Sequence, residues 1–335
     1  MFDSTIPPTF ADVEAAAARI ASHALETPLI ENVALNERLG GRVFLKLESL
    51  QRTGSFKFRG AYNRISLIPE GQRAGGVVAF SSGNHAQGVA AAAGLFGMPA
   101  IIVMPKDAPR AKIEGTKALG AEVVFYDRVT DDREAIAAKI MEERGATLVR
   151  PFDDVGIVVG QGTIGLEIAR QAKARGISLD TVFIPCSGGG VASGVALALS
   201  GASPGTRAVA VEPENFDGMR LSLKAGKRVS APGGPLSMAD ALMAPIPGVV
   251  PFALAQQLMV PGLTVNEDEL AVAVAYAADR LKLIIEPGGT AGLAALLGGR
   301  YDVHGKTVAV VLTGGNCDLE TLTACRARAA QLKVL

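Results

Sequence analysis

Short runs of apolar residues alternate with longer segments in which apolar residues recur on one helical face. The apolar runs predict strands, which fall at 43–48, 76–80, 100–105, 121–127, 181–186, 208–212 and the start of 307–316. The longer segments predict helices, which fall at 11–24, 85–97, 108–120, 131–145 and 191–200. Short, continuously apolar strands that alternate with helices are typical of parallel sheets covered on both faces. The pattern therefore predicts an α/β protein.

A stretch without charged side chains, 74–105, suggests how the chain is organised. Polar and turn-forming residues interrupt it, so it predicts a strand, a helix and a second strand inside the protein and not a membrane span. With the strands that follow, it predicts a small α/β domain over 73–152. This domain would be inserted between the two segments, 1–72 and 153–335, of a larger domain.

The composition is that of a globular protein and narrows the class of partner. Of 335 residues, 49% are hydrophobic and 20% charged, and 33 basic residues balance 33 acidic ones. Without a basic excess, nucleic acid and anionic membranes are not the expected partners, and a small molecule is. The three cysteines and three histidines are scattered, which excludes a disulfide framework or a zinc cluster. We therefore expect a reducing, cytoplasmic location.

The sequence CSGGGVASG (186–194) follows one predicted strand and opens a helix. Glycine lets backbone N–H groups approach an anion closely, and a helix N-terminus favours negative charge. The segment fits a phosphate cradle, a dinucleotide fingerprint completed by Glu212, or only a tight turn. From this segment alone, all three interpretations stay open. The cradle would be built from Ser187, Gly188, Gly189 and Gly190.

Two other segments carry candidate chemistry. Lys57 lies between two phenylalanines in GSFKFRGA (54–61), a setting that lowers the pKa of an amine and prepares it for imine formation. A solvent-facing lysine on a strand gives the same pattern. The second segment precedes a predicted helix and offers hydroxyl and N–H donors for a substrate carboxylate, or an ordinary helix cap. Its side chains are Ser81, Ser82, Asn84 and His85.

Five motifs in order decide between these alternatives. They are GSFKFRGA, SSGNHAQG, SGGG, EPGGTAG and TGGN, and together they span most of the chain. This combination resembles the serine/threonine dehydratase and serine racemase family of fold-type-II pyridoxal-phosphate enzymes. The resemblance implies a tryptophan synthase β-like fold with two parallel-sheet lobes covered by helices. It also implies a homodimer.

The resemblance assigns roles to the cofactor-binding residues. Lys57 matches the Schiff-base lysine, Phe56 adjoins it, and residues 187–190 match the phosphate cradle, which displaces the dinucleotide interpretation. Asn84 matches the residue that hydrogen-bonds the ring hydroxyl, and Thr313 the hydroxyl that faces the pyridine nitrogen. A neutral hydroxyl makes the ring a weaker electron sink than a carboxylate would, which favours prompt loss of a β-leaving group.

Three further residues complete the expected site. Ser82 would face the cofactor opposite Lys57, where racemases place their second acid/base, and dehydratases also keep a serine there. Glu286 would lie near the cofactor edge. Arg133 aligns with an arginine shared by serine racemase and 3-hydroxyaspartate dehydratases, and would pair with a β-carboxylate. An ordinary solvent-facing helix arginine is the alternative.

The implied activity is β-elimination from a 3-hydroxy-L-amino acid, with L-threonine or L-serine giving a 2-oxo acid and ammonia. The alternatives are 3-hydroxyaspartate as substrate and serine racemisation. A nicotinamide oxidoreductase would explain the glycine loop but leaves GSFKFRGA and SSGNHAQG without roles. Some relatives also hold a divalent cation where this chain has Glu212, but Gly218 stands where a second acidic ligand is expected. We expect one carboxylate to make a poor cation site unless Asp217 substitutes.

Overall fold

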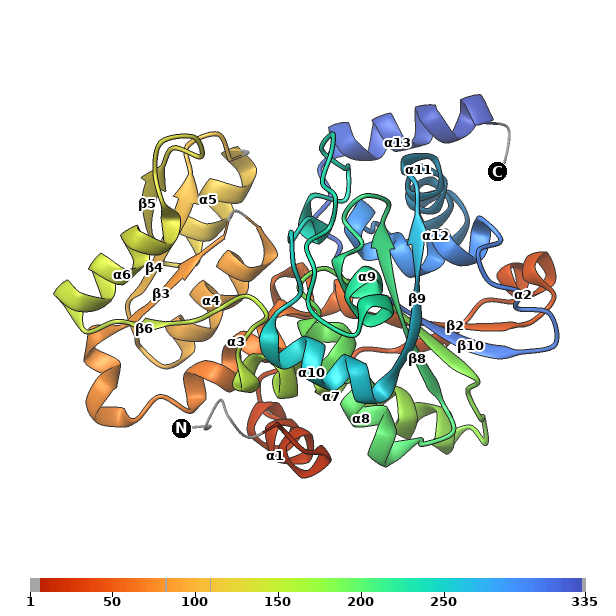
Figure 1. Ribbon diagram of the computed structural model, residues 1–335, viewed down its shortest axis with the longest axis horizontal. Helices are drawn as coiled ribbons and strands as arrows, with labels where there is room; N and C mark the ends of the chain where they lie inside the picture. Colours follow the sequence, from red (N-terminus) through yellow and green to blue (C-terminus); the bar gives the residue numbers. More distant parts are fainter. Residues whose placement is uncertain (1–6, 82, 109, 333–335) are drawn as a thin grey trace.

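Two β-sheets with helices on their faces make up the molecule (Figure 1), seen here in a computed structural model. The structure describes residues 7–81, 83–108 and 110–332. Ten strands fall within these ranges: β1 (Leu29–Glu31), β2 (Arg42–Leu47), β3 (Val77–Phe80), β4 (Ala100–Pro105), β5 (Glu122–Tyr126), β6 (Thr147–Leu148), β7 (Thr181–Pro185), β8 (Arg207–Pro213), β9 (Met259–Val265) and β10 (Thr307–Leu312).

The helices connect these strands and cover both sheets. Within the same ranges they are α1 (Phe10–Ile20), α2 (Val33–Leu39), α3 (Lys57–Ser66), α4 (Asn84–Leu95), α5 (Arg110–Ala118), α6 (Arg133–Arg144), α7 (Val155–Ala174), α8 (Gly190–Ala202), α9 (Gly218–Ala225), α10 (Val249–Leu258), α11 (Glu267–Tyr276), α12 (Ala291–Leu297) and α13 (Leu319–Leu332). Short helical turns include η1 (Glu48–Leu50), η4 (Asp240–Leu242) and η6 (Pro287–Thr290).

The larger sheet has the strand order β1-β2-β10-β7-β8-β9. Its neighbours pair in parallel except β1, which runs antiparallel to β2 at the edge. Side chains alternate across the sheet: Val43 and Leu45 pack toward α11 and α12, whereas Phe44 packs toward α7 and α8. Burial on both faces explains why these strands are apolar throughout.

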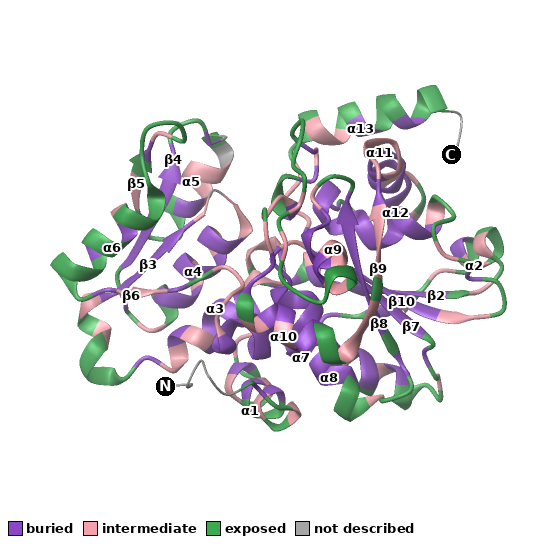
Figure 2. Cartoon of the chain, viewed as in Figure 1, coloured by how far each residue is buried: buried purple, intermediate pink, exposed green. Residues whose placement is uncertain are grey.

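The smaller sheet has the order β5-β4-β3-β6 and is parallel throughout. It lies beside the larger one, at the left of Figure 1. Val77 and Ala79 of β3 pack with α3 and α4, and Val78 packs on the opposite face with α6. Figure 2 shows the consequence, because buried residues follow the strands of both sheets and exposed ones follow the outer faces of the helices.

A buried ion network joins the elements around the start of α3. Arg59 is fully buried and bonds Glu48 of η1 at 2.7 Å (Nε to Oε2) and Glu167 of α7 at 2.6 Å (Nη1 to Oε1). Lys46 of β2, also fully buried, bonds Glu167 at 2.6 Å. Burial alone would lower the pKa of Arg59, but the carboxylates of Glu48 and Glu167 raise it. The network fixes α3 against β2 and α7.

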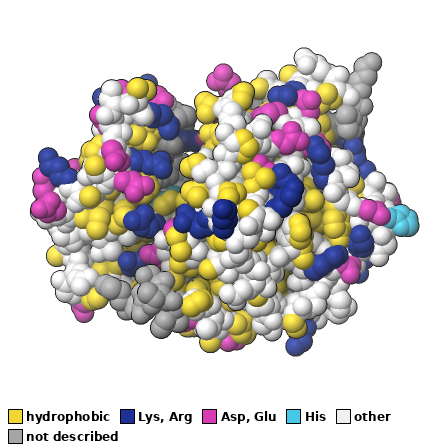
Figure 3. All heavy atoms as spheres, in the orientation of Figure 1, with side chains coloured by type: hydrophobic (Ala, Val, Ile, Leu, Met, Phe, Trp, Pro, Cys, Tyr) yellow, Lys and Arg dark blue, Asp and Glu magenta, His cyan; other side chains and the backbone are white. Residues whose placement is uncertain are grey.

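The predicted α/β class and parallel sheets are confirmed, with differences in detail. The antiparallel strand β1 was not predicted, and neither was α7, which is apolar on most sides because it lies between other helices. The region around Lys57 begins a helix, so the strand considered there is wrong. Figure 3 shows basic and acidic side chains interspersed on the visible face. In the part of the chain that the structure describes, no helix has the length and apolar character needed to cross a bilayer.

Candidate active site

A cavity of about 420 Å³ lies where strands of both sheets end. Its lining includes Phe80 at the end of β3, Pro185 at the end of β7 and Thr313 just after β10. The carboxyl ends of parallel strands are where open α/β sheets place their ligands. Most of the predicted site residues line this one cavity, although they come from segments far apart in the sequence.

Lys57 lines the cavity from the first position of α3. Its Nζ donates a hydrogen bond to the carbonyl oxygen of Pro151 at 2.9 Å and lies 5.1 Å from the ring centroid of Phe56. Burial lowers the pKa of Lys57 to about 8, although the charge of Glu286 opposes the shift. A part of the amine is therefore unprotonated, and nucleophilic, at a pH just above neutral, where an exposed lysine remains almost fully protonated.

The glycine loop, residues 187–190, connects β7 to α8 and lines the same cavity. Gly189 has a φ of +94°, a conformation that favours glycine. A Cβ on Gly188 would lie 2.4 Å from the ring of Phe152, so side chains are excluded there as well. The first N–H groups of α8 have no partners within the helix. They give this end of the cavity a positive potential suited to a phosphate.

A chain of hydrogen bonds crosses the cavity wall between the two sheets. Asn84, at the start of α4, donates from Nδ2 to Oε1 of Glu286 at 2.6 Å. Asn316 donates from Nδ2 to Oδ1 of Asn84 at 2.7 Å. Burial raises the pKa of Glu286 to about 7, against the opposing effect of the bond from Asn84. Thr313 is buried nearby, and its carbonyl oxygen accepts a hydrogen bond from the Phe56 N–H.

The serine-rich turn before α4 lies partly in the cavity. Ser81 lines it, and its Oγ accepts a hydrogen bond from the Gly83 N–H at 3.2 Å. His85 also lines it, but its Nε2 lies 2.9 Å from the carbonyl oxygen of Val149, so that nitrogen carries the proton and donates it there. Burial, followed by the charge of Lys57, lowers the pKa of His85 to about 3. The Nε2 proton is therefore directed at Val149, and a contact of His85 with a substrate carboxylate stays a prediction. Ser82 lies outside the described residues.

Basic side chains from the smaller sheet lie along the cavity. Arg133 begins α6, and its guanidinium lies 5.0 Å from the ring centroid of Phe80. Two other cations that line the cavity already have carboxylate partners: Lys112 bonds Asp240 at 2.7 Å, and Arg128 bonds Asp107 at 2.8 Å. Among the ion pairs of the described residues, none involves Arg133.

Several site residues were not found from the sequence. Phe152 packs beneath the glycine loop, and Asn316 bonds Asn84. Lys112 bonds Asp240 from the opposite side of the cavity. Asn316 stands in the TGGN motif, so its position was a usable signal. A single phenylalanine and a single helix lysine carry no such signal, because their partners lie far away in the sequence.

Glu212 lies outside the cavity lining, at the end of β8. It is fully buried, and its two carboxylate oxygens accept hydrogen bonds from the N–H groups of Met219 at 2.9 Å and Arg220 at 2.8 Å. Asp217 is bonded by the Arg220 guanidinium, with 2.8 Å from Nε to Oδ2. Within the described residues, no group of three or more His, Cys, Asp or Glu side chains could hold a metal ion. This donor set does not fit a divalent cation.

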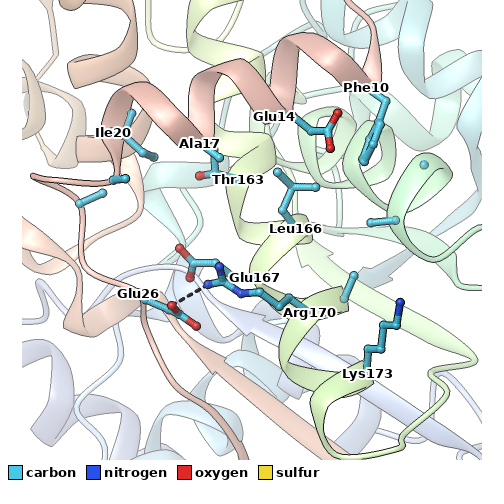
Figure 4. A pocket seen from close by; sticks show the side chains of 15 residues that line it. Phe10, Glu14, Ala17, Ile20, Glu26, Thr163, Leu166, Glu167, Arg170 and Lys173 are labelled. Carbon is cyan, nitrogen blue, oxygen red and sulfur yellow. Dashed lines mark ion pairs between the residues drawn. The ribbon is translucent and has the colours of Figure 1, made fainter.

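A larger cavity, about 720 Å³, lies between α1, α7 and α8 (Figure 4). Phe10, Ile20 and Leu166 line it, and an ion pair joins Glu26 to Arg170 at 2.6 Å. It contains neither a glycine loop nor any of the predicted site residues. Size therefore does not identify the active site here, and the convergence of reactive groups does.

The smaller cavity fits pyridoxal phosphate. A lysine with a lowered pKa faces it, and a helix N-terminus with close-packed glycines forms one end. Such a lysine beside an anion cradle, at the carboxyl ends of two parallel sheets, defines a fold-type-II pyridoxal-phosphate enzyme. The comparisons agree. Residues 20–314 match the family model described as "Pyridoxal-phosphate dependent enzyme", and the chain belongs to this family.

Similar proteins cover nearly the whole chain. An L-threonine ammonia-lyase of Thermotoga maritima is 40% identical over 314 residues, covering 94% of this chain and 77% of its own. An L-threo-3-hydroxyaspartate ammonia-lyase of Pseudomonas sp. is 42% identical over 312 residues, covering 93% and 96%. The structure of maize serine racemase matches with a TM-score of 0.90 and 34% identity, covering 98% of this chain and 99% of that one.

Proposed function

We propose that this protein is an ammonia-lyase that converts a 3-hydroxy-L-amino acid, in the first place L-threonine or L-serine, to a 2-oxo acid and ammonia. The observation that carries the proposal is the Lys57 amine, with its lowered pKa, in the same cavity as the glycine loop. Pyridoxal phosphate, when bound, withdraws electrons from the α-carbon of an attached amino acid and so weakens its bond to the α-proton.

Each side chain of the cavity has a proposed task. Lys57 carries the cofactor and, once the substrate amine has replaced it, accepts the α-proton at Nζ. The N–H groups of the glycine loop hold the phosphate. Asn84 donates to the ring hydroxyl, in an orientation supported by its bonds to Glu286 and Asn316. The Thr313 hydroxyl faces the ring nitrogen. For Ser82, the proposed role is proton transfer on the opposite face.

A second candidate substrate, L-threo-3-hydroxyaspartate, is supported by Arg133. This guanidinium lines the cavity and rests on Phe80 without a carboxylate partner among the described ion pairs. A β-carboxylate would supply that partner in a charge-assisted hydrogen bond. The 42% identical Pseudomonas relative is named for this substrate. Racemisation of serine is the remaining candidate, and it depends on Ser82.

Ammonia release from L-threonine, L-serine and L-threo-3-hydroxyaspartate tests the proposal. We expect at least one of them to release ammonia, and Lys57→Ala to lower kcat by about a hundredfold or more. Lys173→Ala is the matched control, because Lys173 lines the other cavity. After borohydride treatment, mass spectrometry should find the cofactor adduct on Lys57. An adduct on another lysine, or no ammonia from any of the three substrates, would contradict the proposal.

The proposal extends to the organisation of the whole protein. Residues 73–152, which contain the smaller sheet, are proposed to form an inserted domain, and 1–72 with 153–335 the larger one. We also propose a homodimer in the cytoplasm. Free thiols at Cys186, Cys317 and Cys325 are compatible with a reducing compartment. Sedimentation at a mass of twice 34.5 kDa would support the dimer, and sedimentation at the monomer mass would oppose it.

A further inference from the structure

The loop after β8 contains a second charged cluster, remote from Lys57, that the proposed reaction does not use. Arg220 of α9 bonds both carboxylates of this cluster, those of Glu212 and Asp217. Its backbone N–H donates to Oε2 of Glu212 at 2.8 Å, and its guanidinium donates to Oδ2 of Asp217 through Nε and Nη2. Glu212 is 0% exposed and Asp217 3%, so water screens neither carboxylate well. The Arg220 guanidinium supplies the positive charge beside Asp217.

We propose that the Arg220 guanidinium takes the place of the divalent cation that some relatives hold here, so that the enzyme needs no Mg²⁺ or Ca²⁺. Ca²⁺ takes six to eight oxygen ligands and Mg²⁺ six, and in both cases carboxylate oxygens with free lone pairs must face the ion. Here both oxygens of Glu212 already accept backbone N–H bonds, and Gly218 contributes no side chain. The oxygen of Asp217 that would face an ion is bonded by Arg220.

This cluster is connected to the cofactor site through Met219. The Met219 N–H donates to Glu212, and the Met219 side chain packs against the glycine loop, where a Cβ on Gly189 would lie 2.4 Å from its terminal methyl. Directly after β7, the Cys186 N–H donates to Val211 of β8. The position of α9 against β8 therefore sets where the Met219 side chain packs on Gly189. Arg220 is a positioning residue for the loop proposed to bind the cofactor phosphate.

The consequence is a holoenzyme whose stability and cofactor retention do not respond to divalent cations. The first measurement needs no variant. The thermal midpoint, and the fraction of pyridoxal phosphate retained after dialysis, are compared in EDTA, Mg²⁺ and Ca²⁺. We expect the same midpoint and the same retained fraction in all three. A midpoint that falls in EDTA and recovers in Mg²⁺ or Ca²⁺ would overturn the inference.

Substitution of Arg220 tests the replacement directly. Arg220→Gln leaves Asp217 buried without a cation, so we expect the holoenzyme midpoint to fall by roughly 4 °C or more and retention of the cofactor to fall with it. The matched control is Arg300→Gln, since Arg300 bonds Glu269 of α11 and Glu214 of the same loop but neither Glu212 nor Asp217. If the two variants lose the same stability and retain the same cofactor, the inference is wrong.

The last experiment restores the carboxylate ligand that is missing at position 218. The double variant Gly218→Asp with Arg220→Gln supplies a second carboxylate and removes the guanidinium. Mg²⁺ or Ca²⁺ should now raise its thermal midpoint, and a double variant that ignores both ions would overturn the inference. The inference rests on the proposed function only where the retained fraction of pyridoxal phosphate is measured. The change of the thermal midpoint with EDTA, Mg²⁺ or Ca²⁺ reports the cation alone. This inference and the proposed function can therefore fail separately.

Discussion

Arg133 is one side chain whose surroundings distinguish between substrates. It lies over Phe80 at the cavity edge, whereas Lys112 and Arg128 are already paired. A charge-assisted bond to a β-carboxylate contributes on the order of 1.5–3 kcal/mol, which corresponds to roughly ten- to a hundredfold in specificity. Arg133→Ala should therefore lower kcat/KM for L-threo-3-hydroxyaspartate by that factor and change kcat/KM for L-threonine little.

The control for Arg133 lies on the same helix. Arg144 ends α6 and bonds Glu122 at 2.6 Å, away from the cavity lining, so Arg144→Ala should change neither substrate. Steady-state kinetics with both substrates and all three proteins provide the comparison. If Arg133→Ala affects the two substrates equally, Arg133 is an ordinary helix arginine and the threonine and serine activity stands alone.

Lys57 predicts a dependence on pH. Burial lowers its pKa from 10.5 to about 8. Only the unprotonated amine attacks the cofactor aldehyde, so covalent attachment of pyridoxal phosphate to the cofactor-free protein should accelerate with a midpoint near pH 8 and level off at higher pH. The charge of Glu286 opposes the shift, so Glu286→Gln should move the midpoint to lower pH. Stopped-flow absorbance measures both, and a wild-type midpoint near 10.5 would refute the assignment.

At the scale of one element, the N-terminus of α8 depends on the absence of side chains. A Cβ on Gly188 would lie 2.4 Å from the Phe152 ring. Gly188→Ala therefore must displace Phe152 or the loop, and overpacking of this kind costs about 1–3 kcal/mol. We expect a lower free energy of unfolding and incomplete cofactor occupancy. Gly205→Ala is the control, because nothing lies within 4 Å of the added Cβ, and it should keep its cofactor. Equal losses of stability and cofactor in both variants would contradict the role of Gly188.

Hydrophobic periodicity predicted seven of the ten strands of the described residues but only five of their thirteen α-helices. The strands over 76–80 and 100–105 lie where the pattern placed them. Helix α7 escaped prediction because fourteen of its twenty residues are buried, which removes the polar face that marks a helix. Strand β9 was also missed, since its partly buried residues and internal Pro261 and Gly262 weaken the signal of a strand.

The candidate site was predictable wherever a motif is contiguous. GSFKFRGA and the glycine loop supplied Lys57 and the proposed phosphate site from local sequence. Contacts between distant segments were not predictable in this way. The bond from Lys112 to Asp240 and the packing of Phe152 on Gly188 both depend on tertiary structure. The burial that makes His85 neutral likewise appears only once the chain is folded.

For the molecule as a whole, the buried network around Arg59 joins β2, η1, α3 and α7, and so fixes the element that begins at Lys57. Removing one member leaves buried carboxylates without their partner. We expect Arg59→Met to lower the free energy of unfolding by about 3–5 kcal/mol. Arg144→Met, in an exposed pair, should change it little. Chemical denaturation measures both, and equal effects would show that the network contributes no more than a surface pair.

The position of β10 has a consequence for how the protein is made. This strand lies between β2 and β7 in the larger sheet, yet it is synthesised after the other five strands of that sheet. Until residues 307–312 leave the ribosome, β2 and β7 have no strand between them, and each presents an open apolar edge. The sheet that carries the glycine loop therefore closes only once β10 has been synthesised. A nascent chain stalled before Thr307 would be a natural client for chaperones that shield exposed strands.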